Sequence, residues 1–366
     1  NAAKEAIANL GLTDADYILK TNVPEGQECY ETAMDLVDKG CNIIFADSFG
    51  HEPYMIDAAK ENPDVQFCHS TGTRAHTEGL ANYHNAFASI YEGRYLAGIA
   101  AGLKLNEMID AGKFTADEAM VGYVGAFTYA EVVSGYTSFF LGVRSVCPTA
   151  TMKVTFTGSW YDETLEKEGA QKLIGLGCKL ISQHADSLGA PTACESAGVP
   201  NVSYNGSTKD TCPNTFIVSS RIDWAPYYEM CIKAVMDGTE IPADWTGTLA
   251  TGSVVLTDVN ETVAAEGTAE AIAAATEKLE KGELHVFDTA TFTTRADDTM
   301  NQFKVDFLKV DADGHITSYL ADVDTDQAYT GDTEVVHDGY FAESEKRSAP
   351  YFDLEIDGIE RLDTKM

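Results

Sequence analysis

"GCNIIFADS" occupies residues 40–48 and "GCKLISQHADS" occupies residues 177–187, so the chain contains nearly the same phrase twice. Each phrase begins with Gly-Cys, continues through a short apolar run and ends in Asp-Ser. An apolar run bounded by polar residues is typical of a buried parallel strand whose carboxyl end reaches solvent. We therefore expect two equivalent strands that carry Asp47-Ser48 and Asp186-Ser187 at their tips.

The sequence on either side of the two phrases repeats as well. Apolar residues at helical spacing precede each phrase, in "ETAMDLVDK" and "EKEGAQKLIGL". A helix, a turn and a strand follow each, in "MIDAAKENPDVQFCHSTG" and "TACESAGVPNVSYNGST". Repeats of this length indicate duplicated lobes. The predicted fold class is α/β, with two similar doubly wound Rossmann-like lobes joined by a hinge and an extra C-terminal β-hairpin segment.

The repeat also predicts where the domains begin and end. We expect the first lobe at 1–119 and the second at 120–240. A strand and a helix at 241–290 are expected to return toward the hinge and the first lobe. Residues 291–366 are polar with scattered aromatics, which predicts an appended surface segment with a β-hairpin around Asp313-Gly314.

The two lobes are predicted to differ at their beginnings. The second lobe begins with the strand "MVGYVGAF" at 120–127, whereas the first begins with a helix and then a strand, "DYILKTNVP", at 16–24. By the internal symmetry, the first strand of the first lobe is expected upstream of Asn1. Because the sequence begins without Met, processing or truncation upstream is expected too, and the lack of a visible signal peptide proves nothing.

Charge and cysteine content restrict the classes of partner. The chain has 58 acidic and 25 basic residues, a net charge of −33, so nucleic acids and anionic membrane surfaces are not expected as partners. None of the eight cysteines forms a C-x-x-C pair, which argues against a zinc ribbon or a thioredoxin-type motif. Cys41, Cys178 and Cys231 lie in apolar runs and are predicted to be buried free thiols.

The motifs of the common enzyme classes are missing from the sequence. It has no G-x-S-x-G, no H-E-x-x-H, no Walker A motif and no glycine fingerprint after a strand. The acid–base pairs that can be named are His51 with Glu52 and His184 with Asp186. We therefore expect no catalytic residue, no metal site and no cofactor.

Polar and aromatic residues gather instead at the predicted strand ends of both halves. In open α/β sheets this edge forms the ligand crevice. Aromatic rings together with Asp and Asn suit a planar ligand that carries N–H and hydroxyl groups. Helix capping by Asp47 and Asp186, and packing of Trp160 inside its own lobe, are the structural alternatives. The predicted ligand-binding residues are Ser48, Phe49, Trp160, Asp162, Asp186, Asn205, Asp223 and Trp224.

Four stretches together resemble the basic membrane protein family: "IIFADSFGHEPYMIDAAKENPDVQFCHSTG", "YEGRYLAGIAAG", "GSWYDETLEKEGAQKLI" and "DWAPYY". The resemblance covers about residues 1–285. It implies a type I periplasmic-binding-protein fold and the role of a solute-binding subunit of an ATP-driven importer, with a membrane permease as partner. It also implies an extracytoplasmic, membrane-anchored lipoprotein. Characterised members of the family bind purine nucleosides or nucleobases, and others bind riboflavin.

The resemblance also implies roles for single residues. Trp160 matches the stacking aromatic of the second lobe, with Asp162 two positions later. Asn205 stands where many relatives have an Asp that binds the ribose, and no Lys is present around Ile222-Asp223, where nucleoside binders often carry one. These departures favour a nucleobase or another flat heterocycle over a nucleoside. The loop that carries an Asp and an aromatic in the family would lie before Asn1.

Two other classes of function stay open at this stage. An α/β enzyme that acts on a nucleoside or a sugar would use one of the two His-carboxylate pairs. A ligand-sensing regulator would need a DNA-binding or signalling segment, and the sequence shows no basic helix-turn-helix pattern. Within the binding-protein class, another small solute such as a flavin remains an alternative.

Overall fold

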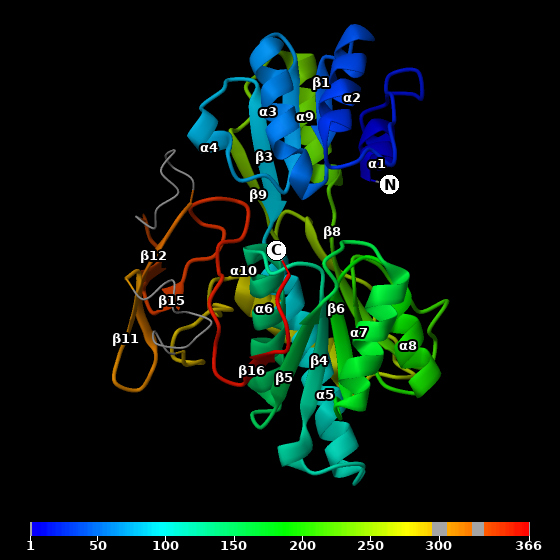
Figure 1. Cartoon of the computed structure of the whole chain (residues 1–366), viewed down its shortest axis with the longest axis vertical. Coiled ribbons are helices and arrows are strands. Elements are labelled where there is room, and N and C mark those ends of the chain that lie inside the picture. Colours follow the sequence, from blue (N-terminus) through cyan, green and yellow to red (C-terminus); the bar gives the residue numbers. More distant parts are fainter. Residues whose placement is uncertain (1, 295–305, 324–332, 366) are drawn as a thin grey trace.

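The chain folds into two lobes, each built around its own mainly parallel sheet (Figure 1). The structure is a computed structural model that describes residues 2–294, 306–323 and 333–365. Each sheet is covered by helices on both faces, and the carboxyl ends of its parallel strands point toward the other lobe. The two-lobed α/β architecture predicted from the repeated phrase is confirmed.

The first lobe contains a four-stranded parallel sheet. Its strands, in spatial order, are β1 (Ile43–Ala46), β2 (Gln66–Ser70), β3 (Tyr83–Ala88) and β9 (Asp244–Gly247). One face packs on α2 (Gln27–Asp38) and α3 (Glu52–Glu61), and the other on α1 (Ala2–Asn9) and α9 (Ala225–Asp237). The short elements η1 (Phe49–His51) and α4 (Ala75–Glu78) follow β1 and β2.

The second lobe contains a seven-stranded sheet in which the edge strand β10 alone runs antiparallel. Its strands, in spatial order, are β10 (Val254–Leu256), β8 (Phe216–Ile222), β7 (Asn201–Tyr204), β6 (Leu180–His184), β4 (Met120–Gly125), β5 (Thr151–Phe156) and β16 (Ile359–Arg361). Its helices are α5 (Ile90–Asp110) and α6 (Ala130–Val146) on one face, α7 (Glu163–Gly175) and α8 (Gly189–Ala197) on the other, and the short η2 (Ala116–Glu118) before β4.

Two helices pack in the lobe opposite to the one in which the predicted domain boundaries place them. Helix α5, expected within 1–119, packs on α6 and β8 of the second lobe, and α9, expected within 120–240, packs on the first-lobe sheet. Helix α10 (Thr268–Glu280) packs on α5 and does not return to the first lobe. The physical reason is that the chain crosses between the lobes after β3, after β8 and after β9, so each crossing moves the next helix to the other sheet.

The crossing segments are held side by side by backbone hydrogen bonds. Ser89 N donates to Gly247 O at 2.8 Å, which ties the first crossing to the third. Asp223 N donates to Ser253 O at 2.8 Å, which ties the second crossing to the third. The hinge therefore consists of adjacent extended segments and not of one flexible linker.

The strand predicted at residues 16–24 does not form. Its counterpart in the second lobe, β5, pairs with β4, and the described part of the first lobe contains no strand equivalent to β4. Without an edge to pair with, the segment stays irregular, and Ile18 and Leu19 are 44% and 59% exposed.

The C-terminal segment is more than a surface appendage, which corrects the prediction for 291–366. The predicted hairpin is present as β11 (Leu308–Val310) and β12 (Ile316–Ala321), followed by β13 (Thr333–Glu334), β14 (Val336–His337) and β15 (Tyr340–Phe341). Phe341 and Phe352 are buried and pack on Phe287 in the same core as α5 and α6. These aromatics look scattered in the sequence because irregular segments, which have no regular apolar period, carry them. In the fold they nevertheless converge in one core.

The burial of the cysteines matches the prediction with one exception. All eight cysteines are free thiols, and Cys178 and Cys231 are buried, whereas Cys41 is partly exposed, contrary to the prediction. Burial raises the pKa of Cys178 to about 12, which makes this thiol inert at neutral pH.

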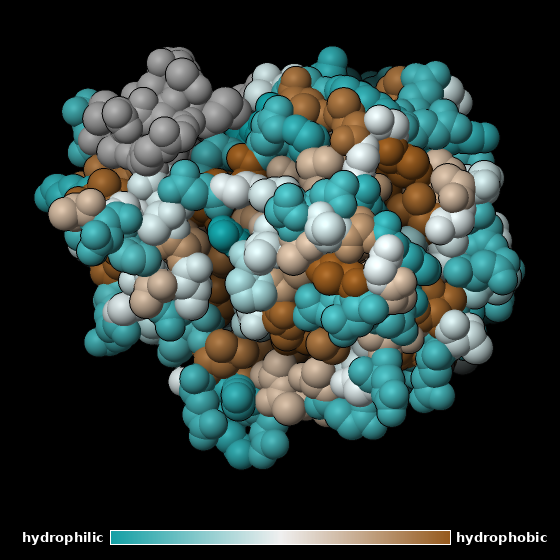
Figure 2. Space-filling view, turned by 90° about the horizontal axis from the view of Figure 1, so that it is seen from below, coloured by the Kyte–Doolittle hydropathy of each residue, from teal (hydrophilic) through white to brown (hydrophobic). Residues whose placement is uncertain are grey.

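Among the described helices, none combines the length and apolar character needed to span a bilayer. Seen from the second-lobe end, the surface is mainly hydrophilic with hydrophobic residues interspersed (Figure 2).

Helices α5 and α6 approach each other so closely that only glycine fits at the contact. A Cβ atom on Gly98 would lie 2.1 Å from Phe139 O, and one on Gly142 would lie 2.0 Å from Tyr95 O. Both clashes involve backbone atoms, which cannot move aside as a flexible side chain can. This contact positions α5, and with it Arg94, behind the second-lobe sheet.

We expect Gly98→Ala to lower the free energy of unfolding by about 1–3 kcal/mol, because the helices must separate to accept the methyl group. Gly175→Ala, at the end of α7, is the matched control. Its Cβ would meet nothing within 4 Å, so a gain of up to about 1 kcal/mol is expected. Chemical denaturation of both variants measures the difference. Equal stabilities would contradict the close packing.

Candidate ligand-binding site

A cavity of about 180 Å³ lies between the lobes, at the carboxyl ends of the strands of both sheets. This is the edge at which open α/β sheets bind ligands. Six of the eight predicted residues line it, and all of its lining residues come from strand ends, helix starts or the hinge. They are Asp47, Ser48, Phe49, Thr71, Phe87, Glu131, Trp160, His184, Asp186, Tyr204, Asn205, Ile222 and Trp224.

The loop after β1 forms the first-lobe wall of the cavity, and side chains of the same lobe hold it by hydrogen bonds. His69 Nε2 donates to Ser48 O at 2.7 Å. Glu25 Oε1 accepts from Ser48 Oγ at 2.6 Å and from Gly50 N at 2.8 Å. The Ser48 hydroxyl is therefore engaged by Glu25, while Asp47 is exposed and Phe49 points its ring toward the second lobe, where it meets Tyr129.

Four aromatic rings connect the two lobes at the cavity. Phe49 stacks on Tyr129 with 5.0 Å between ring centroids, and Tyr129 stacks on Phe127 at 5.1 Å. Phe127 meets Trp160 edge to face at 5.2 Å. We call these four residues the aromatic wall. Trp160 is only partly buried, so it is not enclosed in the core of its own lobe and keeps part of its surface toward the cavity.

Asp186 and Asn205 form the polar side of the second-lobe wall. Asn205 Nδ2 donates to Asp186 Oδ1 at 2.7 Å, and the Asn205 backbone adopts a left-handed φ of 61°. Asp186 is exposed to solvent, yet the protein atoms around its carboxyl displace part of the water and raise its pKa, and the Asn205 hydrogen bond opposes that shift. Asp186 N also donates to Trp160 O at 2.9 Å, which fixes the carboxylate relative to the aromatic wall.

His184 lies deeper than Asp186 and is fully enclosed. Its Nε2 is 3.5 Å from Glu131 Oε1 and its Nδ1 is 3.5 Å from the Tyr123 hydroxyl. The Tyr204 ring packs on the imidazole with 4.1 Å between centroids. Glu131, at the start of α6, faces the cavity beside His184.

Asp162 and Asp223, both predicted as ligand-binding residues, lie outside the lining of the cavity. Asp162 caps α7, because its Oδ1 accepts from Leu165 N at 2.9 Å. Asp223 Oδ1 accepts from Ala225 N at 3.0 Å at the start of α9. Helix capping, the structural alternative considered for other Asp residues, therefore describes Asp162, whereas Asp223 precedes the N-cap residue Trp224 and closes a local turn before α9.

The pairs considered for acid–base chemistry have structural partners. Glu52 is buried and accepts from the backbone of Thr73 at 2.8 Å and Arg74 at 2.9 Å, and from the Tyr83 hydroxyl at 2.9 Å. His51 Nε2 donates to Val23 O at 3.1 Å. His184 and Asp186 both line the cavity, but their hydrogen bonds go to different residues.

Several lining residues were not among the predicted ones. Thr71, Phe87 and Ile222 follow or end strands, a position that sequence reasoning could have marked at every strand and not only at the repeated phrase. Tyr204 ends β7 and has the same strand-end signal, whereas Glu131 begins a helix and shows no signal in the sequence pattern.

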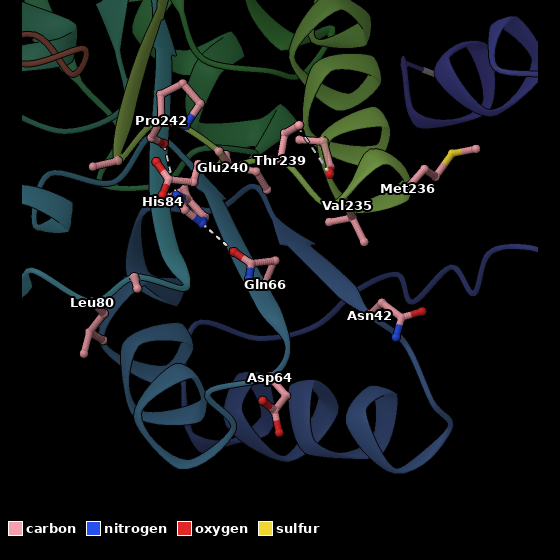
Figure 3. A pocket seen from close by; sticks show the side chains of 15 residues that line it. Asn42, Asp64, Gln66, Leu80, His84, Val235, Met236, Thr239, Glu240 and Pro242 are labelled. Carbon is pink, nitrogen blue, oxygen red and sulfur yellow. Dashed lines mark hydrogen bonds between the residues drawn. The ribbon is translucent and has the colours of Figure 1, made fainter.

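A larger hollow of about 1180 Å³ lies at the opposite end of the first-lobe sheet (Figure 3). Asn42, Gln66 and His84 line it from the amino-terminal ends of the strands, and Val235 from the last turn of α9. Apart from the imidazole of His84, which is bonded to Gln66 Oε1 and Pro242 O, its lining has no aromatic ring. We place the candidate site in the smaller interlobe cavity, because rings and polar side chains from both lobes converge there.

The interlobe cavity presents aromatic rings and hydrogen-bonding side chains to a small molecule. Its lining residues include three carboxylates, Asp47, Glu131 and Asp186, and no Lys or Arg. Carboxylates accept from N–H and O–H groups and repel anions. The site therefore suits a neutral or cationic ligand with several donors at its edge.

Comparison with known proteins gives the family and a set of relatives. The profile of PnrA-like ABC transporter substrate-binding proteins matches residues 5–286. A purine-binding protein of Brucella abortus is 32% identical over 238 residues, 65% of this chain and 63% of that protein. A Haloferax volcanii protein named as an ABC transporter glucose-binding protein is 32% identical over 269 residues, 73% of this chain and 64% of that protein. The chain thus spans less than two thirds of the length of either relative.

Solved structures agree on the fold. An ABC transporter solute-binding protein of Aeropyrum pernix superposes with a TM-score of 0.65 at 17% identity, covering 83% of this chain and 90% of the other. One of Conexibacter woesei superposes with a TM-score of 0.59 at 20% identity, covering 77% and 90%.

The raised pKa of Asp186 gives a pH-dependent expectation. Its folded-state pKa lies above the ordinary value of 3.8, so ionised Asp186 destabilises the empty protein once the pH exceeds that value. We expect Asp186→Asn to raise the melting temperature of the unliganded protein at neutral pH. The gain should shrink as the pH falls toward 3.8 and vanish below it. Thermal melts across this range test the sign, and a gain that grows toward acid would contradict it.

Proposed function

The chain belongs to the family of PnrA-like ABC transporter substrate-binding proteins, and from this we propose that it binds a flat heterocycle, a purine base or nucleoside, and delivers it to a membrane permease. The lobes close around the solute at the interlobe cavity, and the protein catalyses no reaction. We propose an extracytoplasmic location, with anchoring as a lipoprotein, because the family works outside the cytoplasmic membrane.

The observation that carries the proposal is the pairing of rings with carboxylate and amide groups in one cavity. Trp160 presents an indole on one side, and Asp186 with Asn205 presents hydrogen-bonding groups fixed to the same loop. Stacking on an aromatic ring contributes roughly 1–3 kcal/mol per base. The carboxylate then selects among bases by the N–H groups at their edges.

The size of the cavity favours a base over a nucleoside. Its volume of about 180 Å³ is below the roughly 300–1,000 Å³ that is usual for drug-sized ligands. Asn205 stands in place of the ribose-binding Asp, and it is already bonded to Asp186. A base needs no sugar contact from either residue.

A sugar is the second candidate solute, because one of the relatives is named for glucose. Aromatic stacking also suits a pyranose ring, and the carboxylates could accept its hydroxyls. A flavin, with three fused rings, would require a wider opening of the lobes. An enzyme acting on a nucleoside would use His184, whose neighbours in the cavity are Glu131 and Tyr204.

Isothermal titration with adenine, adenosine, glucose and riboflavin tests the proposed solute class. We expect heat from at least one purine and none from glucose, and no product of adenosine after prolonged incubation. Binding of glucose without any purine would overturn the heterocycle proposal. Release of free base from adenosine, abolished by His184→Ala, would replace transport with enzymatic hydrolysis.

Trp160→Ala is expected to weaken purine binding by about ten- to hundredfold, since the stacking face is lost. Trp160→Phe should keep most of the affinity, because a flat ring remains. Chemical denaturation of the unliganded variants supplies the control. If Trp160→Ala lowers stability while the folded fraction binds normally, Trp160 has a packing role and no stacking role.

A phosphate group on the solute is expected to abolish tight binding. The cavity lining carries Asp47, Glu131 and Asp186 and no basic side chain, and like charges brought together cost several kcal/mol. We expect adenosine monophosphate to bind at least about a hundredfold more weakly than adenosine in parallel titrations. Equal affinities would show that the phosphate avoids the carboxylates, and would contradict this orientation of the solute.

A further inference from the structure

The segment after β15 reaches two loops beside the candidate site, although it lies outside residues 5–286, the part of the chain that matches the family. Strand β16 pairs in parallel with β5, with Glu360 opposite Lys153 and Arg361 opposite Val154. Figure 1 shows it at the edge of the second-lobe sheet, with the chain continuing toward the level of the gap between the lobes.

A buried ion pair fixes this segment to α6. Arg361 pairs with Glu355, and both side chains are 8% exposed. Tyr136, on α6, donates its hydroxyl to Glu355 Oε1 at 2.6 Å and accepts from Arg361 Nε at 2.8 Å. Breaking a buried pair by removing one partner is strongly destabilising, so β16 is a fixed part of the lobe.

Beyond β16, Asp363 binds the end of β5. Its Oδ1 accepts from Phe156 N at 2.7 Å, and its Oδ2 accepts from Thr155 Oγ1 at 2.6 Å. Lys172 Nζ, on α7, donates to the same Oδ2 at 3.0 Å. Asp363 thus satisfies a backbone N–H at the point where β5 ends and the loop to Trp160 begins.

Two residues later the segment binds the neighbouring loop. Lys365 N donates to Thr128 Oγ1 at 2.8 Å, and Thr128 N donates to Lys365 O at 2.7 Å. This reciprocal pair lies next to Tyr129 of the aromatic wall. The Lys365 side chain passes along Gly158, where a Cβ would meet its Cδ at 3.5 Å.

The two loops held in this way are residues 126–129 and 157–160, which we call the ring loops. They carry Phe127, Tyr129 and Trp160, and they are bonded to each other through Gly158 N and Ala126 O at 2.8 Å. The second ring loop accepts the Asp186 amide at Trp160 O. A fixed ring loop presents its aromatic side chains without the loss of freedom that a mobile loop suffers on binding.

We propose that Asp363 is a positioning residue for the solute site, and that residues 362–365 hold the ring loops in their binding arrangement. This inference rests on the proposed function, since it assigns these residues to the binding of that solute. Asp363 itself touches no part of the cavity lining and acts through Phe156, Thr155 and the loop that follows them.

Asp363→Ala and Glu360→Ala form a matched pair of variants. Both remove a carboxylate of the same segment that pairs with a lysine, Lys172 or Lys153. Glu360 is 61% exposed, and its pair lies along the strand and away from the loops. We expect Asp363→Ala to weaken binding of adenine or adenosine, whichever the wild-type protein binds more tightly, by about three- to tenfold, and Glu360→Ala to change it by less than about twofold.

Hydrogen exchange of the unliganded proteins separates positioning from general stability. The amides of Gly158 and Asp186 report on the ring loops, and neither of them is bonded to Asp363. We expect both amides to exchange faster in Asp363→Ala, with core amides of β6 unchanged. Thr128→Val, which removes the acceptor of Lys365 N, should have the same effect from the other loop.

Unchanged exchange at Gly158 and Asp186, or faster exchange with unchanged affinity for the tighter-binding purine, would overturn the positioning role. If the wild-type protein binds neither adenine nor adenosine, the proposed function fails on its own. The exchange measurement uses no solute, and it would still decide whether Asp363 holds the ring loops.

Discussion

The carboxyl ends of β6, β7 and β8 form the second-lobe wall of the cavity, and one buried cation holds these three strands together. Arg94, on α5, is fully buried, and it donates to Ser182 Oγ at 2.5 Å, Ser203 O at 3.1 Å and Ser220 Oγ at 3.2 Å, one on each strand. A buried charge is tolerated only when hydrogen bonds and polarisable neighbours replace water. The rings of Phe139, Tyr123 and Tyr204 supply the rest, at 5.0, 5.4 and 5.6 Å from the guanidinium carbon. Two serines that interrupt the apolar strands, Ser182 and Ser220, accept from this cation through their hydroxyls, whereas Ser203 accepts through its backbone carbonyl.

This arrangement also bears on the charge of the cavity. Tyr204 lies between Arg94 on its buried side and Glu131 and Asp186 in the cavity, and all three charges act on its hydroxyl. Arg94 does not offer its guanidinium to the solute, since it has no exposed surface. The cavity therefore remains acidic toward a ligand although a positive charge lies within its wall.

The repeated phrase predicted the sheets, the polar strand tips and the fold class, because burial and strand-end chemistry are local properties of sequence. The lobe in which a helix packs is not a local property. The apolar residues of α5 and α9 predict helices but do not report the sheet on which they pack, because the crossings of the chain decide it. The same limit applies at the site. Asp186 and Asp162 both follow strands, but one faces Asn205 in the cleft and the other caps its own helix. Glu131 and His184 meet across α6 and β6, and no spacing in the sequence reports that contact.

The C-terminal segment shows why composition misleads for irregular chain. Its aromatics have neither the period of a strand nor that of a helix, so they read as isolated surface residues, yet Phe341 and Phe352 complete the core over Phe287. Once that core and the Arg361–Glu355 pair hold the segment, β16 covers the edge of β5 that would otherwise be unpaired. The same segment contacts the first lobe, where Ser348 N donates to Asp244 Oδ2 at 2.7 Å. Residues beyond the family match thus contact both lobes, and they join the lobes in addition to the three crossings of the hinge.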